Sequence, residues 1–286
     1  MGCRLLVILT KNLSKAVGFL LLFVRYSIIM GLNTGKGALR VGEIIAVLSG
    51  KGGTGKTTVC AGLAAALAAA GRKVLCVDCD VGLRNLDIAL GLADRGGPSF
   101  LDLCRGDGDF SALAPHPDYP SLFFLTAPVN CRPEQIPADA FAALLRRAGA
   151  EFDQVLLDAP AGIDAGFRLA ADAADRILLV TGPDPAAIRD AARTADVLEL
   201  MHKTGIRLIV NRVRPRMVSR LHLTVDDIMD QAGLPLMGII PEDPKVPLAA
   251  AAETPLLRYS RRGAAAAACR RIAARLQGLP EPIQIR

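Results

Sequence analysis

Residues 49–58 read Ser-Gly-Lys-Gly-Gly-Thr-Gly-Lys-Thr-Thr, a combination of residue types that can bind phosphate. From Gly50 to Thr57 the stretch fits the phosphate-binding loop pattern G-x-x-x-x-G-K-[ST]. Its glycines let backbone N–H groups turn inward around an anion. Lys56 can reach the terminal phosphates of a nucleotide, and the Thr57 hydroxyl can ligate Mg²⁺. The residues assigned to this site are Gly50, Lys51, Gly52, Gly53, Thr54, Gly55, Lys56 and Thr57.

Three acidic residues could complete the chemistry of this phosphate site. Asp158 ends an apolar run, where a carboxylate can hold an Mg²⁺-bound water in the Walker B role or merely cap a strand. Asp80 begins a polar loop and could orient the attacking water, because phosphoryl transfer depends mainly on positioning and charge stabilisation. Asp78, just before it, could support either role or serve as a hydrogen-bonded turn carboxylate.

Lys51 is an additional cation that a phosphate loop does not need. Two lysines of one short loop can hardly serve the same phosphates. A lysine that crosses a two-fold axis to the partner's nucleotide would resolve this difficulty, much as an arginine finger acts in trans. The alternative interpretation is a solvated surface lysine.

The flanking segments predict the elements that must position these residues. Residues 43–49 (EIIAVLS) form a buried-strand pattern, and residues 57–70 are Ala-rich and helical up to Gly71. A strand, a loop and a helix N-terminus together give the geometry that binds phosphate. Further strands and helices alternate along the chain, which predicts an α/β fold with a single doubly wound, mostly parallel sheet and helices on both faces. The predicted strands are 43–49, 73–78, 122–125, 154–158, 176–181, 206–211 and 236–240.

Charge is distributed unevenly, in a way that argues against nucleic-acid binding. The formal net charge is +6, but residues 1–41 hold six basic residues and no acidic one. Residues 258–286 hold seven arginines against one glutamate, which leaves residues 42–257 at −6. The predicted folded body is therefore mildly acidic, with a basic tail.

Seven scattered cysteines indicate a reduced, cytosolic setting rather than a disulfide framework. Cys76 and Cys79 match C-x-x-C, but residues three apart on a strand point to opposite faces. We therefore expect two buried core thiols instead of a redox or metal pair.

Residues 1–41 are expected to lie outside the packed fold. The apolar stretch between Ala16 and Val24 is too short to span a bilayer. A basic start before an apolar run is typical of a signal peptide or anchor, but a nucleotide site favours translation that begins at Met30. We accordingly predict an extension over residues 1–41, an ATPase domain over 42–278 and a tail over 279–286.

The phosphate loop with its extra lysine resembles the deviant Walker A motif of the ParA/MinD family of ATPases. Residues 81–87 (VGLRNLD) resemble the family's switch I, and residues 158–163 (DAPAGI) resemble its switch II. The similarity extends from about Glu43 to Leu276. The switch loops favour the branch that places the division septum. Partition ATPases that bind DNA usually differ in both loops, whereas flagellar-number regulators come closer and stay an alternative.

This resemblance implies an Mg²⁺-dependent ATPase that forms a homodimer when ATP is bound. Catalysis would fall to Lys51, Lys56, Asp80 and Asp158, with Thr57 and Asp158 at the metal. The resemblance adds further cofactor contacts, which are Thr58 at the α-phosphate and Asn211, Pro241, Glu242 and Asp243 around the adenine. Implied partners are a MinC-like division inhibitor and an activating partner of the MinE type or another kind, with the helix around Arg189 as a candidate surface.

Relatives of this family attach to the cytoplasmic face of the membrane through a C-terminal amphipathic helix. Here residues 263–277 combine arginines with a mostly alanine face, and Pro280 and Pro282 prevent a helix beyond them. We expect residues 263–277 to pack on the body, so that any membrane attachment by the tail is weak. A metal-cluster carrier of the nitrogenase-iron-protein type is a third hypothesis, disfavoured because the Cys76–Cys79 pair is expected to be buried.

Overall fold

Residues 42–93, 95–214 and 224–283 are described by the computed structural model. The predictions for residues 1–41 lie outside this part of the chain. Among the described residues, no helix combines the length and hydropathy needed to cross a membrane.

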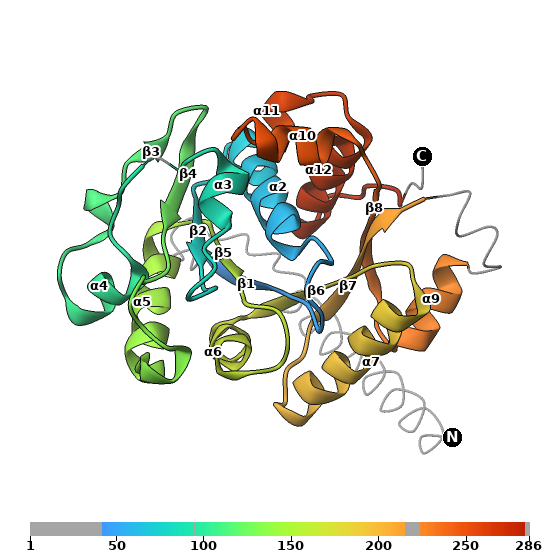
Figure 1. The fold of residues 1–286 in the computed structure, drawn as a ribbon, viewed down its shortest axis with the longest axis horizontal. Coiled ribbons are helices and arrows are strands. Elements are labelled where there is room, and N and C mark those ends of the chain that lie inside the picture. The colour runs from blue at the N-terminus through green and yellow to red at the C-terminus, as the bar shows by residue number, and fades with distance from the viewer. Residues whose placement is uncertain (1–41, 94, 215–223, 284–286) are drawn as a thin grey trace, which may run out of the picture. The chain divides into compact units, whose positions relative to one another are not determined.

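Strands and helices alternate along the chain, as the sequence predicts (Figure 1). The strands are β1 (Glu43–Leu48), β2 (Val74–Asp78), β3 (Pro115–His116), β4 (Tyr119–Leu125), β5 (Gln154–Asp158), β6 (Arg176–Thr181), β7 (Ile206–Val213) and β8 (Leu236–Pro241). The α-helices are α2 (Lys56–Ala69), α3 (Leu86–Leu90), α4 (Phe100–Arg105), α5 (Ala138–Glu151), α6 (Ala165–Ala173), α7 (Pro185–Leu200), α9 (Val225–Ala232), α10 (Lys245–Ala251), α11 (Leu256–Tyr259) and α12 (Ala264–Leu276). Two short 3₁₀ helices are η1 (Phe110–Ala112) and η2 (Pro133–Gln135).

The strands form one sheet in the order β3-β4-β2-β5-β1-β6-β7-β8. Every neighbouring pair is parallel except β3 and β4. Strand β1 lies between β5 and β6, so the chain crosses over to both sides of it. Ligands of open parallel sheets bind at the carboxyl ends of the strands near such a switch point.

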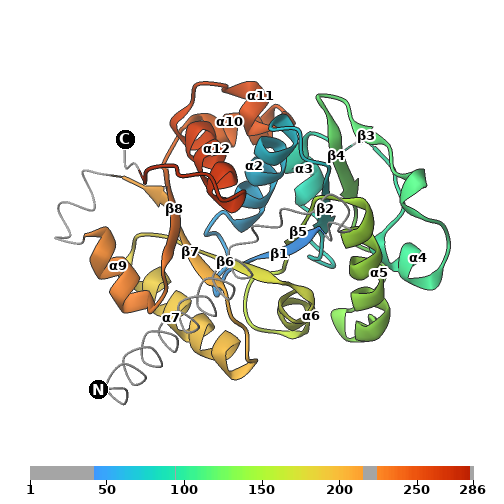
Figure 2. The same ribbon diagram turned by 180° about the vertical axis from the view of Figure 1, so that it is seen from behind.

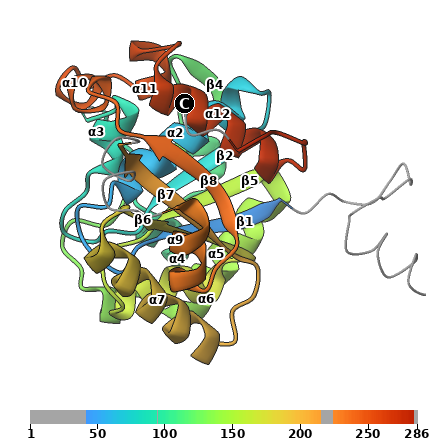
Figure 3. The same cartoon turned by 90° about the vertical axis from the view of Figure 1, so that its right-hand side faces the viewer.

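Side chains of β1 alternate between two cores, one on each face of the sheet. Ile45 and Val47 belong to the core shared with α2, α3, α10, α11 and α12. Ile44, Ala46 and Leu48 belong to the core beneath α4, α5, α6 and α7. Figure 3 shows the sheet edge-on between these two helix layers, and Figure 2 shows α5 and α6 side by side below the sheet. The predicted doubly wound architecture is confirmed.

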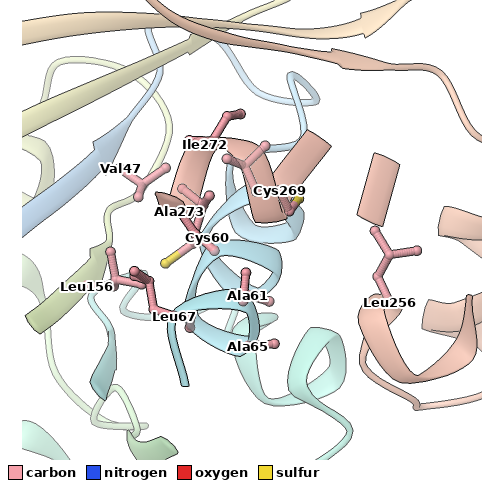
Figure 4. Packing of buried hydrophobic residues seen from close by; sticks show 14 of the residues in the cluster. Val47, Cys60, Ala61, Ala65, Leu67, Leu156, Leu256, Cys269, Ile272 and Ala273 are labelled. Atoms are coloured by element: carbon pink, nitrogen blue, oxygen red, sulfur yellow. The ribbon is translucent and has the colours of Figure 1, made fainter. Parts of the chain in front are cut away.

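Small residues allow α2 to pack closely against the final helix α12, which also packs on β8. Gly62 of α2 approaches Cys269 of α12 so closely that an added methyl group would lie 2.8 Å from the Cys269 sulfur. Figure 4 shows Cys269, Ile272 and Ala273 of α12 in the same cluster as the residues of α2. The prediction that residues 263–277 pack on the body is confirmed.

The shortest elements were not predicted. Residues 79–87 read as one polar loop, yet α3 begins at Leu86 because Leu86 and Leu90 are both fully buried. Helix α4 begins after Ser99 with a capping box, in which Ser99 and Asp102 bind each other's backbone N–H groups. Strand β3 and helix α11 have only two and four residues, too few to produce a periodic pattern.

Candidate nucleotide-binding site

The phosphate-binding loop lies at the carboxyl end of β1 and ends where α2 begins at Lys56. Gly55 has a φ of 87°, and a methyl group there would lie 2.4 Å from Asn211 Nδ2. Only glycine fits, both for the left-handed backbone and for the close approach. A methyl group at Gly50 would lie 2.2 Å from Thr194 Oγ1, so the first turn of the loop is pressed against α7.

A cavity of about 410 Å³ opens inside this loop. It is lined by every loop residue from Lys51 to Thr58, which the structure therefore brings together as predicted. Gly50 is not among the lining residues, because it packs against α7 behind the loop. The remaining lining residues are Ser49, Asp80, Leu83, Asn85, Ile88, Ala89, Ala161, Arg212 and Ala250.

Lys56 and Asp158 form a buried ion pair at the floor of the loop. Lys56 Nζ lies 2.8 Å from Asp158 Oδ1, with residue exposures of 6% and 1%. The pair forms because β5 is the neighbour of β1, which places Asp158 directly beside Val47. Burial raises the pKa of Asp158, and the Lys56 ammonium offsets part of that rise. The ion pair between Lys56 and Asp158 thus lies beside the phosphate cavity.

The donor set at this floor fits a magnesium nucleotide. Thr57 lines the same cavity, and its side chain helps to lower the pKa of Asp158, so the two predicted metal-site residues lie together. A hydroxyl and one carboxylate suit Mg²⁺, which keeps several waters and takes its other ligands from phosphate oxygens. Among the described residues, no group of three or more His, Cys, Asp or Glu side chains is arranged to hold a metal on its own.

Asp78 and Asp80 lie at the end of β2, next to β5. The Asp78 carboxylate accepts hydrogen bonds from the backbone N–H groups of Asp80, at 2.9 Å, and Leu86, at 3.3 Å. Burial, followed by the nearby charge of Asp158, raises the pKa of Asp78 to about 7. The structure therefore places Asp78 as the turn carboxylate that shapes the loop. Asp80 lies on the wall of the phosphate cavity, where its predicted role requires it to be.

Lys51 is exposed and lines two cavities. One is the phosphate cavity, and the other is a second cavity of about 360 Å³ on the outer side of the loop. Gly182, Pro183 and Asp184 at the start of α7 line that outer cavity as well. Lys51 therefore stands at the surface between its own loop and the beginning of α7.

A larger cavity of about 600 Å³ adjoins the loop beside β7 and β8. Its walls are mainly apolar, with Val59, Ile240, Pro247 and Leu256 among them, which suits a flat nucleobase. All the residues predicted around the adenine line it, namely Asn211, Pro241, Glu242 and Asp243, and Thr58 does so too.

The carboxylates of two of these residues, Asp243 and Glu242, are bound to other groups of the protein. Asp243 accepts hydrogen bonds from the backbone N–H groups of Lys245, at 3.0 Å, and Ala265, at 3.2 Å. Its carboxylate thus joins the start of α10 to the start of α12. Glu242 forms an ion pair with Arg214, and Arg214 Nη2 lies 2.6 Å from Glu242 Oε1. The segment shapes the cavity chiefly through its backbone and through Pro241.

Asn211 connects the two cavities through a buried contact. Its Nδ2 donates to the Thr54 carbonyl oxygen at 2.8 Å. The side chain therefore holds strand β7 against the phosphate loop.

Sequence reasoning missed two arginines that follow Asn211, which are Arg212 and Arg214. Arg212 lines all three cavities described above. The signal was available, because residues 211–214 (NRVR) place two cations directly after a predicted strand. The apolar residues Leu83 and Ile88, which also line the phosphate cavity, were missed as well. Leu83 lies in the segment taken as a polar loop, and Ile88 follows that segment in α3.

The cysteines occupy the places that strand geometry predicts. Cys76 lies in the core on the α2 side of the sheet and Cys79 in the core on the α5 side. Cys76 instead meets Cys60 of α2, with the sulfur atoms 3.7 Å apart. All three are buried, and no cysteine pair at the loop surface supports the metal-cluster hypothesis within the described part of the chain.

Comparisons with known proteins agree with this geometry. The family model of the CobQ/CobB/MinD/ParA nucleotide binding domain matches residues 45–256. The septum site-determining protein MinD of Synechocystis sp. is 40% identical over 242 residues, an alignment that covers 84% of this chain and 91% of the relative. A solved structure of the MinC:MinD cell division protein complex of Aquifex aeolicus contains a chain with a TM-score of 0.78 and 37% identity, which covers 85% of this chain and 98% of that one. The solved structure of MinD of Pyrococcus horikoshii complexed with Mg-ADP gives a TM-score of 0.72 and 29% identity, and the match covers 82% of this chain and 96% of that one.

Proposed function

Because the chain belongs to the CobQ/CobB/MinD/ParA family, and within it to the septum site-determining MinD proteins, we propose that it is an ATPase switch of cell division. It binds Mg-ATP, forms a homodimer, recruits a division inhibitor, and returns to the monomer after hydrolysis to ADP and phosphate. The alternatives of DNA partition and flagellar-number control fit less well, since the relatives at 34–40% identity are septum site-determining proteins.

Residues of the loop bind the triphosphate in this proposal. Backbone N–H groups of the loop and the N-terminus of α2 face the phosphates. The Lys56 ammonium, which donates to Asp158 in the structure, turns to the terminal phosphates and leaves the Asp158 carboxylate and the Thr57 hydroxyl for the metal site. Magnesium, when bound there, neutralises charge on the phosphate oxygens.

Hydrolysis requires a water aligned with the terminal phosphorus and a cation for the charge that develops there. Asp80 lies on the cavity wall and orients that water. Lys51 is exposed at the mouth of the same cavity, so it can extend to the nucleotide of a second subunit. Turnover therefore depends on dimer formation.

A division inhibitor of the MinC type is the proposed partner, because a solved MinC:MinD complex contains a similar chain. Helix α7 offers a candidate surface, since Arg189 and Arg193 are exposed one turn apart. An activating partner of the MinE type or another kind would use the same switch.

Membrane attachment would be weak and peripheral. Ile272 and Leu276 of α12 are buried in the body and cannot insert into lipid. Exposed arginines at Arg261 and Arg262 supply cations for anionic lipid, at about 1 kcal/mol each. Dimerisation would add avidity to this contact.

The observation that carries the proposal is the buried Lys56–Asp158 pair at the floor of a glycine-rich loop. The direct test measures phosphate release and sedimentation with Mg-ATP or Mg-ADP for wild type, Lys56→Ala, Lys51→Ala and Asp80→Ala. Wild type should hydrolyse ATP and dimerise only with ATP. Asp80→Ala should dimerise without hydrolysing ATP. Lys51→Ala should bind ATP but neither dimerise nor hydrolyse it.

A wild-type protein that stays monomeric with ATP, or that dimerises equally with ADP, would refute the switch. Liposome pelleting with anionic vesicles tests the membrane step, with Arg261→Glu/Arg262→Glu as the variant. ATP-dependent pelleting that the variant loses is the expected result, and pelleting that is independent of ATP would contradict it.

A further inference from the structure

Arg212 lies at the junction between the nucleobase cavity and the phosphate cavity. Within the described part of the chain, four residues line both cavities, which are Gly55, Thr58, Arg212 and Ala250. Among these four, Arg212 alone carries a charge. A nucleotide that spans both cavities passes this junction with its ribose and α-phosphate, because these groups connect the base to the terminal phosphates.

The backbone of β7 departs from regular geometry to present this side chain. The pairing of β7 with β8 shifts register between Val210 and Val213, and Arg212 has a φ of 57° in the left-handed region. Bulges next to binding sites re-aim side chains, and non-glycine residues in this region persist where the surroundings enforce them. The enforcing contact is the neighbouring Asn211, whose side chain is bonded to Thr54 of the loop.

The charges around the junction leave the Arg212 guanidinium available. Arg214 is paired with Glu242. Arg212 forms no ion pair with the described residues, and its side chain is exposed. The Arg212 side chain reaches the loop, since its Nε would lie 3.8 Å from a methyl group at Gly55.

We propose that Arg212 contacts the α-phosphate of the bound nucleotide and is a binding residue of this site. This inference rests on the proposed function, because it requires a nucleotide in the two cavities. A guanidinium can donate two N–H groups to phosphate, and such charge-assisted hydrogen bonds are stronger than neutral ones. The contact is made in every nucleotide state that retains the α-phosphate, so it supports ADP and ATP alike.

The position predicts a pattern of affinities. Loss of the guanidinium should weaken the binding of ADP and of Mg-ATP by the same factor, about tenfold, as expected for one charge-assisted contact. Adenosine, which lacks phosphate, should bind unchanged. Arg212→Lys should recover part of the affinity, because a point charge remains without the planar fork.

The experiment is calorimetric titration of adenosine, ADP and Mg-ATP into wild type, Arg212→Gln, Arg212→Lys and the control Arg207→Gln. Arg207 is an exposed arginine of the same strand that lines none of the three cavities. The proposal is supported if Arg212→Gln loses affinity for ADP and ATP equally, while its affinity for adenosine and all affinities of the control variant stay unchanged.

Three results would overturn it. Loss of affinity for ATP alone would place Arg212 at the terminal phosphate. Loss of affinity for adenosine as well would indicate a contact with the base or ribose, or a structural role. Unchanged binding of all three ligands would show that the guanidinium makes no contact. Failure of the proposed function is a separate outcome, because wild type itself would then bind neither ADP nor ATP.

Discussion

Lys56 Nζ lies 2.8 Å from Asp158 Oδ1 in the interior, at the point where the first strand of the sheet passes into the phosphate loop. The two residues are 102 positions apart in the sequence and meet because β1 and β5 are neighbours. A buried charge pair is costly to break, since either partner alone would stay in the interior without compensation. The pair therefore contributes to the stability of the protein, besides its proposed part in nucleotide binding.

Replacing the lysine should reveal this dual role. Lys56→Gln leaves Asp158 buried without its cation and should lower the free energy of unfolding by about 3 kcal/mol near pH 8. Burial favours the protonated form of Asp158, so the loss should shrink near pH 5. Urea unfolding at both pH values measures this, with Lys56→Gln/Asp158→Asn expected to regain most of the stability. An equal loss of stability at both pH values would show that the cost does not come from the buried charge of Asp158.

Asp78 should give stability a pH dependence of defined sign. Its pKa is raised from 3.8 to about 7 in the folded protein. The folded state therefore holds a proton that the unfolded state has lost, and the contribution of Asp78 to stability falls as pH rises from about 4 to 7. Asp78→Asn removes this titration and should raise the free energy of unfolding near pH 8 by on the order of 2 kcal/mol.

The measurement is the difference in unfolding free energy between wild type and Asp78→Asn across this pH range. Glu43, whose pKa is also raised, titrates in both proteins and cancels in the difference. The surface control Asp172→Asn should show no such trend. A difference that is constant with pH would show that Asp78 is not the group responsible.

Gly53 and Gly55 offer a matched pair for the loop. Both have left-handed φ values, 80° and 87°, so alanine costs about 1 kcal/mol at either position. A methyl group at Gly53 meets nothing within 4 Å, whereas one at Gly55 lies 2.4 Å from Asn211 Nδ2. Gly55→Ala should displace Asn211 and lower ATP affinity more than tenfold beyond the effect of Gly53→Ala. Equal affinities of the two variants in a titration would refute the importance of this contact.

The fold could be predicted because its main signals are local. Apolar runs of five or six residues alternate with helical segments, and this alternation alone predicts a parallel sheet with two helix layers. Short elements such as α3 and β3 depend on burial by distant segments. Leu86 becomes helical because the body covers it, and no pattern in five residues indicates this.

The residues of the candidate site likewise fall into those with a local sequence signal and those that depend on distant contacts. The loop and Asp158 carry patterns tied to strand ends, so their positions follow from the sheet. The capping role of Asp243 and the position of Arg212 depend on contacts between β7, β8 and α12, which are far apart in the sequence. Such contacts leave no periodic signal.

The close approach of α2 and α12 should make an ordinarily stabilising substitution harmful. Gly→Ala inside a helix stabilises by about 1 kcal/mol, but at Gly62 the methyl group would lie 2.8 Å from the Cys269 sulfur. Gly62→Ala should therefore destabilise the protein by about 1 kcal/mol or more. In a Cys269→Ala background, the same change should be neutral or stabilising. Thermal unfolding of the four proteins measures the coupling, and additive effects would exclude it.

In the proposed mechanism, Lys51 acts on the nucleotide of the partner subunit, while Asp80 acts on the nucleotide of its own subunit. Mixing inactive Lys51→Ala with inactive Asp80→Ala tests it most directly. A mixed dimer holds one intact site, formed by Asp80 of the first variant and Lys51 of the second, so steady-state phosphate release should return on mixing. Turnover that stays at the level of the separate variants, although mixed dimers form, would show that Lys51 does not act on the partner's nucleotide.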